Sequence, residues 1–260
     1  MNLLITNDDG IHATGINELA ECLAAKHNVY VVAPDIEKSA TSAAITLQYP
    51  LRIKEHKPYK MTNVKKYYHV NGTPADCVKI ALKVVFTGEN QPDMVISGIN
   101  HGPNIGIDVR YSGTVAAAFE GAFAGFPAIA VSSAIPFNEP GHVPKFSAAV
   151  NFIRDNIEKL HEKCIALKNK CVLNINAPSA DYEQIKGTRI TRLNSSKYRD
   201  FYKEIFDPVD RTHYWLTCEK IQADVDDFTD DIAVKNGFVS ITPLKYDQTD
   251  YEALAEFKTL

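Results

Sequence analysis

The sequence predicts an α/β protein with a mostly parallel sheet flanked by helices and a β-rich C-terminal extension. Short β-branched runs alternate with amphipathic stretches of helical spacing through the first two thirds of the chain, which is the pattern of repeated βαβ units. Several of these runs end in glycine or polar residues just before a helical stretch, as strands of an open α/β sheet do. After about residue 187 strand-like runs follow one another with no clear helix between them. We therefore expect one domain over residues 1–260, with a core of about 1–186 and an arm of about 187–260 that packs on a partner.

The first elements establish the βαβ order. Residues 3–5 form a short apolar run typical of a buried parallel strand. Residues 15–26 carry apolar side chains at helical spacing, and residues 29–33 (VYVVA) form a second strand. This order predicts a parallel pair joined by a right-handed crossover.

The other expected elements of the core continue the alternation. Thr73 is a suitable N-cap, Pro74 a suitable first helical residue and Asp76 a favourable first-turn acid. The expected elements are an excursion from the sheet over 47–66, with a hairpin as one option, strands 67–70, 94–97, 128–132 and 172–175, and helices 74–86, 115–124 and 146–167.

The C-terminal part has a different pattern. Residues 189–193, 213–217 and 238–241 are strand-like, and residues 250–258 are suited to a short helix. The acidic residues between 224 and 231 are most simply a solvated loop, because EF-hand spacing is absent.

Composition excludes several classes of protein. The 260 residues are 45% hydrophobic and 23% charged with a net charge of −4, which is typical of a globular protein without a basic nucleic-acid-binding face. No run has the length of a membrane span, and the N-terminus lacks the features of a signal peptide. Five cysteines without a CxxC pair indicate reduced thiols in the cytoplasm rather than a disulfide framework or a zinc site. We therefore expect neither nucleic acid nor membrane as a partner.

Asp8 and Asp9 follow the first strand directly and precede Gly10, which permits a sharp turn. On this stretch alone a solvated Asp-Asp-Gly turn is the favoured interpretation. Ser39 follows the second strand and Asn100 follows the strand at 94–97, so these side chains would converge only if the three strands are neighbours. Carboxylate, hydroxyl and amide oxygens together suit Mg²⁺ or Mn²⁺ and not zinc.

A glycine-rich loop over residues 97–114 is the second informative stretch. Its glycines would let main-chain N–H groups approach an anion, and Ser112, Gly113 and Thr114 stand at a helix start, where a phosphate is held by the helix dipole. The loop is not a Walker A motif, and no GxGxxG follows the first strand. For any single glycine an ordinary turn is the simpler interpretation. His12 and His101 are polar loop residues first and acid–base candidates second.

These stretches resemble the SurE (survival protein E) family of nucleotidases. The resemblance covers most of the chain in the same order, through NDDG at 7–10, APD at 33–35 leading to Ser39, NGTPADCV at 71–78, SGINHGPNIGIDVRYSGTVAAAFEG at 97–121 and GFVSITPL at 237–244. It implies a Rossmann-like core, a homodimer or homotetramer, and one divalent metal ion per subunit, Mg²⁺ or Mn²⁺. It also implies metal ligation by Asp8, Asp9, Ser39 and Asn100, and a phosphate pocket bordered by Asn104, Ser112, Gly113 and Thr114. The family usually shows Arg-Ser-Gly-x-Ser where this chain has KSATS at 38–42, a difference that keeps Ser39 and Ser42 and changes the residues around them.

The resulting hypothesis is a metal-dependent phosphatase, a 5′-nucleotidase that hydrolyses nucleoside 5′-monophosphates, with Asp8 and Asp9 as catalytic residues. The sequence leaves open base preference, activity on 3′-monophosphates and polyphosphate, and which aspartate does more than hold metal. A metal-dependent amidase or deacetylase would need histidine ligands beside the carboxylate pair, and a haloacid-dehalogenase-type phosphatase would need DxDxT. The alternative from another class is a non-catalytic nucleotide- or phosphate-binding regulatory module.

Overall fold

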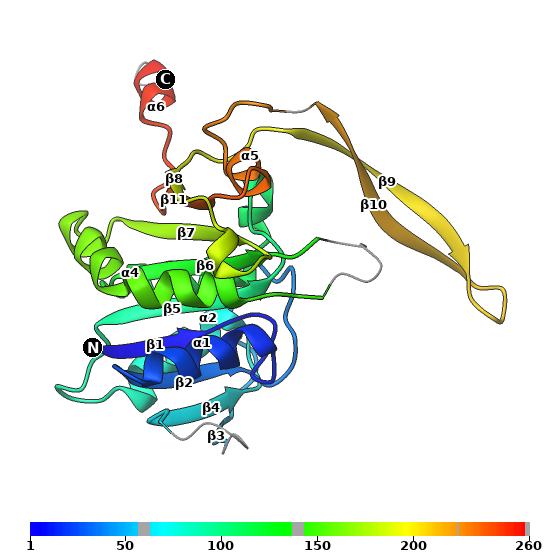
Figure 1. Cartoon of the computed structure of the whole chain (residues 1–260). Helices are drawn as coiled ribbons and strands as arrows, with labels where there is room; N and C mark the ends of the chain where they lie inside the picture. Colours follow the sequence, from blue (N-terminus) through cyan, green and yellow to red (C-terminus); the bar gives the residue numbers. More distant parts are fainter. Residues whose placement is uncertain (57–62, 137–142, 223, 258–260) are drawn as a thin grey trace.

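The structure is a computed structural model that describes residues 1–56, 63–136, 143–222 and 224–257. Within these residues a nine-stranded sheet has the order β3-β4-β2-β1-β5-β6-β7-β11-β8 (Figure 1). The six strands from β4 to β7 are parallel, whereas β3 and β11 each run antiparallel to their inner neighbour. The strands are β1 (Asn2–Thr6), β2 (Asn28–Pro34), β3 (Ile53–Glu55), β4 (Lys66–Val70), β5 (Met94–His101), β6 (Ala128–Ala134), β7 (Cys171–Pro178), β8 (Thr188–Ile190) and β11 (Val239–Lys245). The predicted α/β class with a mostly parallel sheet is confirmed.

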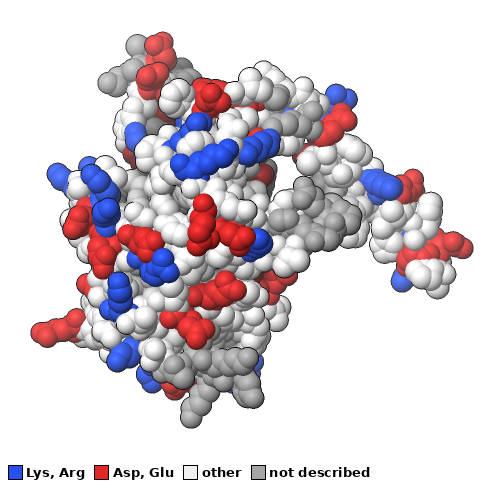
Figure 2. Space-filling view, in the orientation of Figure 1, with Lys and Arg blue, Asp and Glu red and all other residues white. Residues whose placement is uncertain are grey.

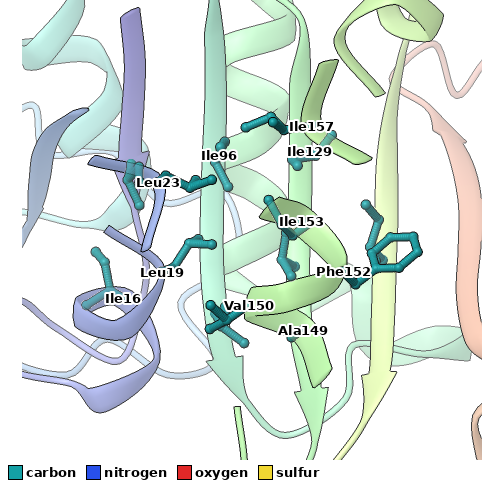
Figure 3. Close-up of a cluster of buried hydrophobic side chains, with 14 of the residues drawn as sticks. Ile16, Leu19, Leu23, Ile96, Ile129, Ala149, Val150, Phe152, Ile153 and Ile157 are labelled. Atoms are coloured by element: carbon teal, nitrogen blue, oxygen red, sulfur yellow. The ribbon is translucent and has the colours of Figure 1, made fainter. Parts of the chain in front are cut away.

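Two pairs of helices cover the two faces of the sheet. Helices α1 (Thr14–Ala24) and α4 (Ser147–Ala166) pack on one face, and Figure 3 shows their apolar side chains, among them Leu19 and Ile153, directed at Ile96 and Ile129 of the sheet. Helices α2 (Pro74–Ile80) and α3 (Gly113–Phe123) pack on the opposite face. Helix α2 continues as a π-helical turn over Ala81–Val85, and short 3₁₀ turns occupy Gly106–Arg110 and Tyr182–Gln184. The predicted helices are therefore present with small shifts of their ends.

The start of α2 has the capping arrangement that its sequence predicts. Thr73 Oγ1 accepts a hydrogen bond from the Asp76 amide, and the Asp76 carboxylate accepts one from the Thr73 amide. Pro74 is the first helical residue. The reciprocal bonds satisfy two amides that a helix start would otherwise leave without partners.

Between residues 47 and 66 the chain leaves the core and returns along the sheet edge. Strand β3 pairs antiparallel with β4, which agrees with the hairpin option, and residues 57–62 of this excursion lie outside the described residues. Strand β5 is longer than predicted, because it continues past Ser97 to His101 after a register irregularity against β6. Asn100 therefore lies on a strand and not in the loop that follows it.

The C-terminal part contains a long two-stranded hairpin that extends away from the body (Figure 1). Strands β9 (Lys197–Phe206) and β10 (Thr212–Gln222) form it, and β9 was not expected from the sequence. The chain then forms α5 (Asp230–Lys235), returns to the main sheet as β11, and ends in α6 (Tyr251–Glu256). The expectation of no helix between the C-terminal strands is wrong, because α5 lies between β10 and β11.

The predicted solvated acidic loop is also wrong for part of its length. The Asp230 side chain is fully buried and accepts hydrogen bonds from the amides of Gly106, Asn194 and Asp231. Asp224 and Asp226 form ion pairs with Arg192. A run of acids in sequence did not reveal Arg192, Asn194 and Gly106 as partners, because these residues lie 32 to 124 positions away.

Candidate active site

Three neighbouring strands bring the predicted oxygen ligands to one edge of the sheet. Strand β1 lies between β2 and β5, and Thr6 of β1 is in register with Ser97 of β5. The residues that follow β1 and β2 therefore emerge beside the end of β5. The neighbour relationship that the sequence argument required is present.

Asp8 is held by the start of α3. Its side chain is 4% exposed. The Thr114 amide donates to Asp8 Oδ2 at 3.1 Å, and the Thr114 hydroxyl donates to Asp8 Oδ1. A Cβ at Gly113 would lie 2.9 Å from Asp8 Cβ, so the absence of a side chain at 113 lets the helix start approach the carboxylate. Both oxygens of Asp8 thus have a donor on the same residue.

Asp9 contacts the end of β5 instead of α3. Its Oδ2 accepts a hydrogen bond from the His101 amide at 3.2 Å. Burial and the adjacent Asp8 carboxylate raise the pKa of Asp9 to about 7, and burial raises the pKa of Asp8 as well. Among the described residues neither aspartate forms an ion pair with a basic side chain. Asp8 is buried and Asp9 is half-buried, and two adjacent carboxyl groups without a basic partner are an arrangement that a cation would stabilise.

Asn100 and Ser39 are the neutral donors beside this pair. The Thr114 hydroxyl lies 3.4 Å from Asn100 Oδ1, so Asn100 and Asp8 share a neighbour. The loop that carries Ser39 is tied to the pair by the Lys38 amide, which donates to the Asp8 carbonyl at 2.7 Å. Ser39 itself is exposed and donates its hydroxyl proton to Glu37. Asp8 and Asn100 thus meet at Thr114, Asp9 contacts the adjacent His101 amide, and Ser39 comes to the same edge through its loop.

This donor set fits a hard divalent cation. It contains two carboxylates, one amide oxygen and one hydroxyl, all of them oxygen donors suited to Mg²⁺ or Mn²⁺. The described residues hold no group of three or more His, Cys, Asp and Glu side chains placed to bind a metal, which is the set that zinc would need. The residues present therefore fit the ion that the resemblance implies.

A cavity of about 300 Å³ opens beside Asp9. Its walls come from the start of α1, the end of β5 and the segment before α4. The lining includes Asp9, His12, Glu37, His101 and Phe146. The two histidines that the sequence marked as second-rank acid–base candidates thus border the same space as one of the two aspartates.

The residues predicted to border a phosphate use their polar groups in contacts with other parts of the protein. The Thr114 amide and hydroxyl are used on Asp8, and Ser112 caps α3 by accepting a hydrogen bond from the Val115 amide. Asn104 is buried: its side chain donates to Ser132 and its main chain bonds to Asn176. Neither Asn104 nor the Ser112–Thr114 turn lines the cavity beside Asp9.

A larger cavity of about 570 Å³ lies on the far flank of α3. It lies between α3, residues 191–193 after β8, and strand β11, and its lining includes Phe119, Phe123 and Tyr246. Ser112 is at its edge, but no residue of the oxygen-donor set lines it. The smaller cavity is therefore the one associated with the predicted chemistry.

Sequence reasoning missed two members of the site. Glu37 was not predicted, although a carboxylate two residues before Ser39 is a candidate that the sequence shows. Phe146 reaches the cavity from the segment before α4, and no local pattern links it to the aspartates. Its ring packs edge-on against His101, with ring centroids 6.2 Å apart.

Comparisons with known proteins show what this chain is similar to. The family model described as Survival protein SurE matches residues 3–200. A protein of Kosmotoga olearia named 5′-nucleotidase SurE is 42% identical over 258 residues, covering 99% of this chain and 97% of that protein. One of the same name from Pelotomaculum thermopropionicum is 44% identical over 262 residues, covering 100% and 95%. The crystal structure of the SurE protein from Aquifex aeolicus superposes with a TM-score of 0.82 at 36% identity, covering 100% of this chain and 99% of that one.

Proposed function

Because the chain belongs to the SurE family, we propose that it is a 5′-nucleotidase, a divalent-metal-dependent phosphatase that converts nucleoside 5′-monophosphates to nucleoside and phosphate. The observation that carries the proposal is the adjacent pair of buried Asp8 and half-buried Asp9 after the first strand, beside neutral oxygen donors and a cavity. A non-catalytic phosphate-binding module would have little need for two uncompensated carboxylates at this place.

Asp8, Asp9, Ser39 and Asn100 would hold the ion, one per subunit. A bound Mg²⁺ or Mn²⁺ supplies Lewis-acid chemistry, polarising phosphoryl oxygens and lowering the pKa of water. This assignment extends the family relationship to named residues. It is supported by the donor chemistry described above.

The two aspartates have different surroundings, which suggests a division of labour. Both oxygens of Asp8 accept hydrogen bonds from Thr114, so Asp8 is held in one orientation and suits the role of a fixed ligand. Only Asp9 of the pair lines the cavity where a substrate would enter. We therefore assign to Asp9 the catalytic role: its carboxylate would contact the reacting phosphate or the attacking water.

The nucleoside would occupy the cavity lined by His12, His101 and Phe146. Aromatic and imidazole rings there offer faces and edges for a base, and the cavity volume of about 300 Å³ is at the lower end for a small-molecule site. The start of α3 would act on the phosphate through the field of its dipole and through Asp8. Direct phosphate contacts by Asn104, Ser112, Gly113 and Thr114 remain a prediction.

The test is phosphate release from a substrate panel by the purified protein. AMP and GMP with Mn²⁺ or Mg²⁺ should release phosphate, and EDTA should abolish release until metal is restored. The 3′-monophosphates and polyphosphate belong in the same panel, since the sequence leaves them open. Tight nucleotide binding by calorimetry with no phosphate released would instead establish the regulatory module.

We propose that the C-terminal part from about residue 187 serves homo-oligomerisation as a dimer or tetramer. The hairpin carries large apolar side chains on both faces: Tyr202, Tyr214 and Leu216 on one, and Phe201 and Trp215 on the other. All are exposed, Trp215 at 68%. An apolar ribbon of this kind suits burial against a second copy of the chain.

We further propose a cytoplasmic protein without nucleic-acid or membrane partners. The face in Figure 2 shows acidic and basic side chains interspersed over the body, and the net charge is −4. Within the described ranges, no helix combines the length and apolar character that crossing a bilayer requires. Five unpaired thiols support a reducing compartment.

A further inference from the structure

Glu37 is a carboxylate of the candidate site with no role assigned so far. Its Oε1 accepts a hydrogen bond from Ser39 Oγ at 2.6 Å. We propose that Glu37 is a positioning residue: by holding the hydroxyl proton of Ser39, it turns the lone pairs of that oxygen toward the metal. The inference rests on the proposed function and goes beyond it by naming what orients the hydroxyl ligand.

The chemistry of a hydroxyl ligand requires such a partner. A neutral serine binds a cation through an oxygen lone pair, so its proton must point to another acceptor. An ionised carboxylate only accepts hydrogen bonds, and a distance of 2.6 Å is in the range of about 2.5–2.7 Å for charge-assisted O–H···O⁻ bonds. Groups that orient a metal ligand in this way commonly change metal affinity by about 10–100-fold when removed.

The backbone of the loop keeps Glu37 and Ser39 at the site. The Lys38 amide between them donates to the Asp8 carbonyl at 2.7 Å. A Cβ at Gly10 would meet the Glu37 nitrogen at 3.3 Å, so the turn after the aspartates packs directly on this loop. Beyond Ser39, the Thr41 hydroxyl donates back to the Lys38 carbonyl at 2.8 Å. The pair is therefore exposed in its side chains and anchored in its main chain.

The surroundings of Glu37 agree with this role. The residue lines the cavity together with Asp9, and in the described part of the chain its carboxylate forms no ion pair with a basic residue. Its charge is thus available to Ser39 and to the metal site. An alternative is that Glu37 acts on the metal only through its negative charge. The Glu37→Gln variant separates the two roles, because it removes the charge and keeps an acceptor for the Ser39 hydroxyl.

The experiment measures Mn²⁺ binding by the metal-free protein, using the EPR signal of free Mn²⁺. Glu37→Ala should weaken binding about tenfold or more, as should Ser39→Ala. Glu37→Gln should stay near wild type, because its amide oxygen accepts the same hydrogen bond. In the Ser39→Ala background, Glu37→Ala should add little further loss. Glu21→Ala, an exposed position on α1 outside the cavity, is the control with the same change of charge.

A second measurement separates positioning from a general effect on folding. The melting temperature of the metal-free protein should be the same for wild type and Glu37→Ala, whereas the increase caused by Mn²⁺ should be smaller in the variant. Unchanged Mn²⁺ affinity in Glu37→Ala would overturn the inference. So would equal losses in Glu37→Gln and Glu37→Ala, or a full additional loss in the Ser39→Ala background.

Failure of the proposed function would look different. If Asp9→Asn and Ser39→Ala both bind Mn²⁺ as tightly as wild type, the metal site itself is misplaced and the role of Glu37 falls with it. If those two variants lose affinity and Glu37→Ala does not, only the role of Glu37 is refuted.

Discussion

The amide and the hydroxyl of Thr114 both donate to the carboxylate of Asp8, so a side chain in the turn after β1 accepts hydrogen bonds from the first turn of α3. The positive end of the helix dipole therefore acts on a predicted metal ligand. A helix start of this kind is expected to bind phosphate directly, yet here its first donors are already in use. The contact links the two motifs that carry the proposed chemistry.

Thr114→Val should weaken metal binding and catalysis together. The valine removes the hydroxyl donor to Asp8 Oδ1 at nearly constant side-chain volume, leaving a buried oxygen without that partner. We expect about a 10–100-fold loss of Mn²⁺ affinity and about 1–3 kcal/mol of stability. Thr114→Ser, which keeps the hydroxyl, is the control for Mn²⁺ titration and urea unfolding. Equal behaviour of the valine and serine variants would mean that the hydroxyl is dispensable.

Asp9→Asn should reduce phosphate release from AMP by at least about 100-fold, because the amide removes the charge that faces the cavity. Steady-state assays at saturating Mn²⁺ distinguish lost chemistry from lost metal. Asp210→Asn, in the turn between β9 and β10 and outside the cavity, is the matched control. Undiminished turnover in Asp9→Asn would exclude Asp9 from the reaction.

Asp76 should make the stability of the protein depend on pH in the acid range. Burial alone raises the pKa of Asp76, but hydrogen bonds from Thr46 and Thr73 outweigh it, and the net pKa lies below the ordinary value of 3.8. Because the folded pKa is lowered, the stabilisation is complete above 3.8 and is lost as the pH falls through the folded value.

The check is urea unfolding of wild type and Asp76→Asn across pH. The free energy of unfolding should be larger for the wild type than for Asp76→Asn by about 1–2 kcal/mol, the usual cost of a lost cap. This difference should be constant near neutral pH and should decrease below pH 3.8. A difference that grows on acidification would contradict this sign.

Asp230→Asn should destabilise the protein by about 1–3 kcal/mol, since the amide nitrogen cannot accept one of the three main-chain hydrogen bonds. The bonds join the glycine-rich loop at Gly106 to the base of the hairpin at Asn194. Chemical denaturation measures the loss, and Asp227→Asn, an exposed position in the same acidic run, serves as control. Equal stability of the two variants would show that the buried bonds contribute little.

Leu216→Lys should reduce the oligomer to a smaller species. Leu216 lies opposite Tyr202 in the hairpin and both are exposed, so a lysine is tolerated in the single chain but opposes burial against a second copy. Sedimentation at micromolar concentration measures the change, with Asp200→Asn as a polar control on the same strand pair. A wild-type protein that sediments as a monomer would refute the proposed role of the hairpin.

Much of the core could be predicted because its signals are local. Leu3 and Leu4 belong to an apolar run that needs burial on both faces, and Thr73, Pro74 and Asp76 specify a helix start through their own chemistry. The C-terminal part was harder. Strand β9 is exposed over its whole length, so its burial pattern does not alternate, and α5 is only six residues long.

The sequence by itself determined the order of strands and helices, the polar residues at the strand ends and the oxygen chemistry of Asp8, Asp9, Ser39 and Asn100. The tertiary structure alone decided that β1 lies between β2 and β5, which brings those residues to one edge. It also decided that Thr114 serves Asp8 and that Asp9 faces the cavity. The physical reason is that side-chain chemistry and periodicity are local properties, whereas strand adjacency and hydrogen-bond partners depend on contacts between segments as far apart as the 106 residues that separate Asp8 from Thr114.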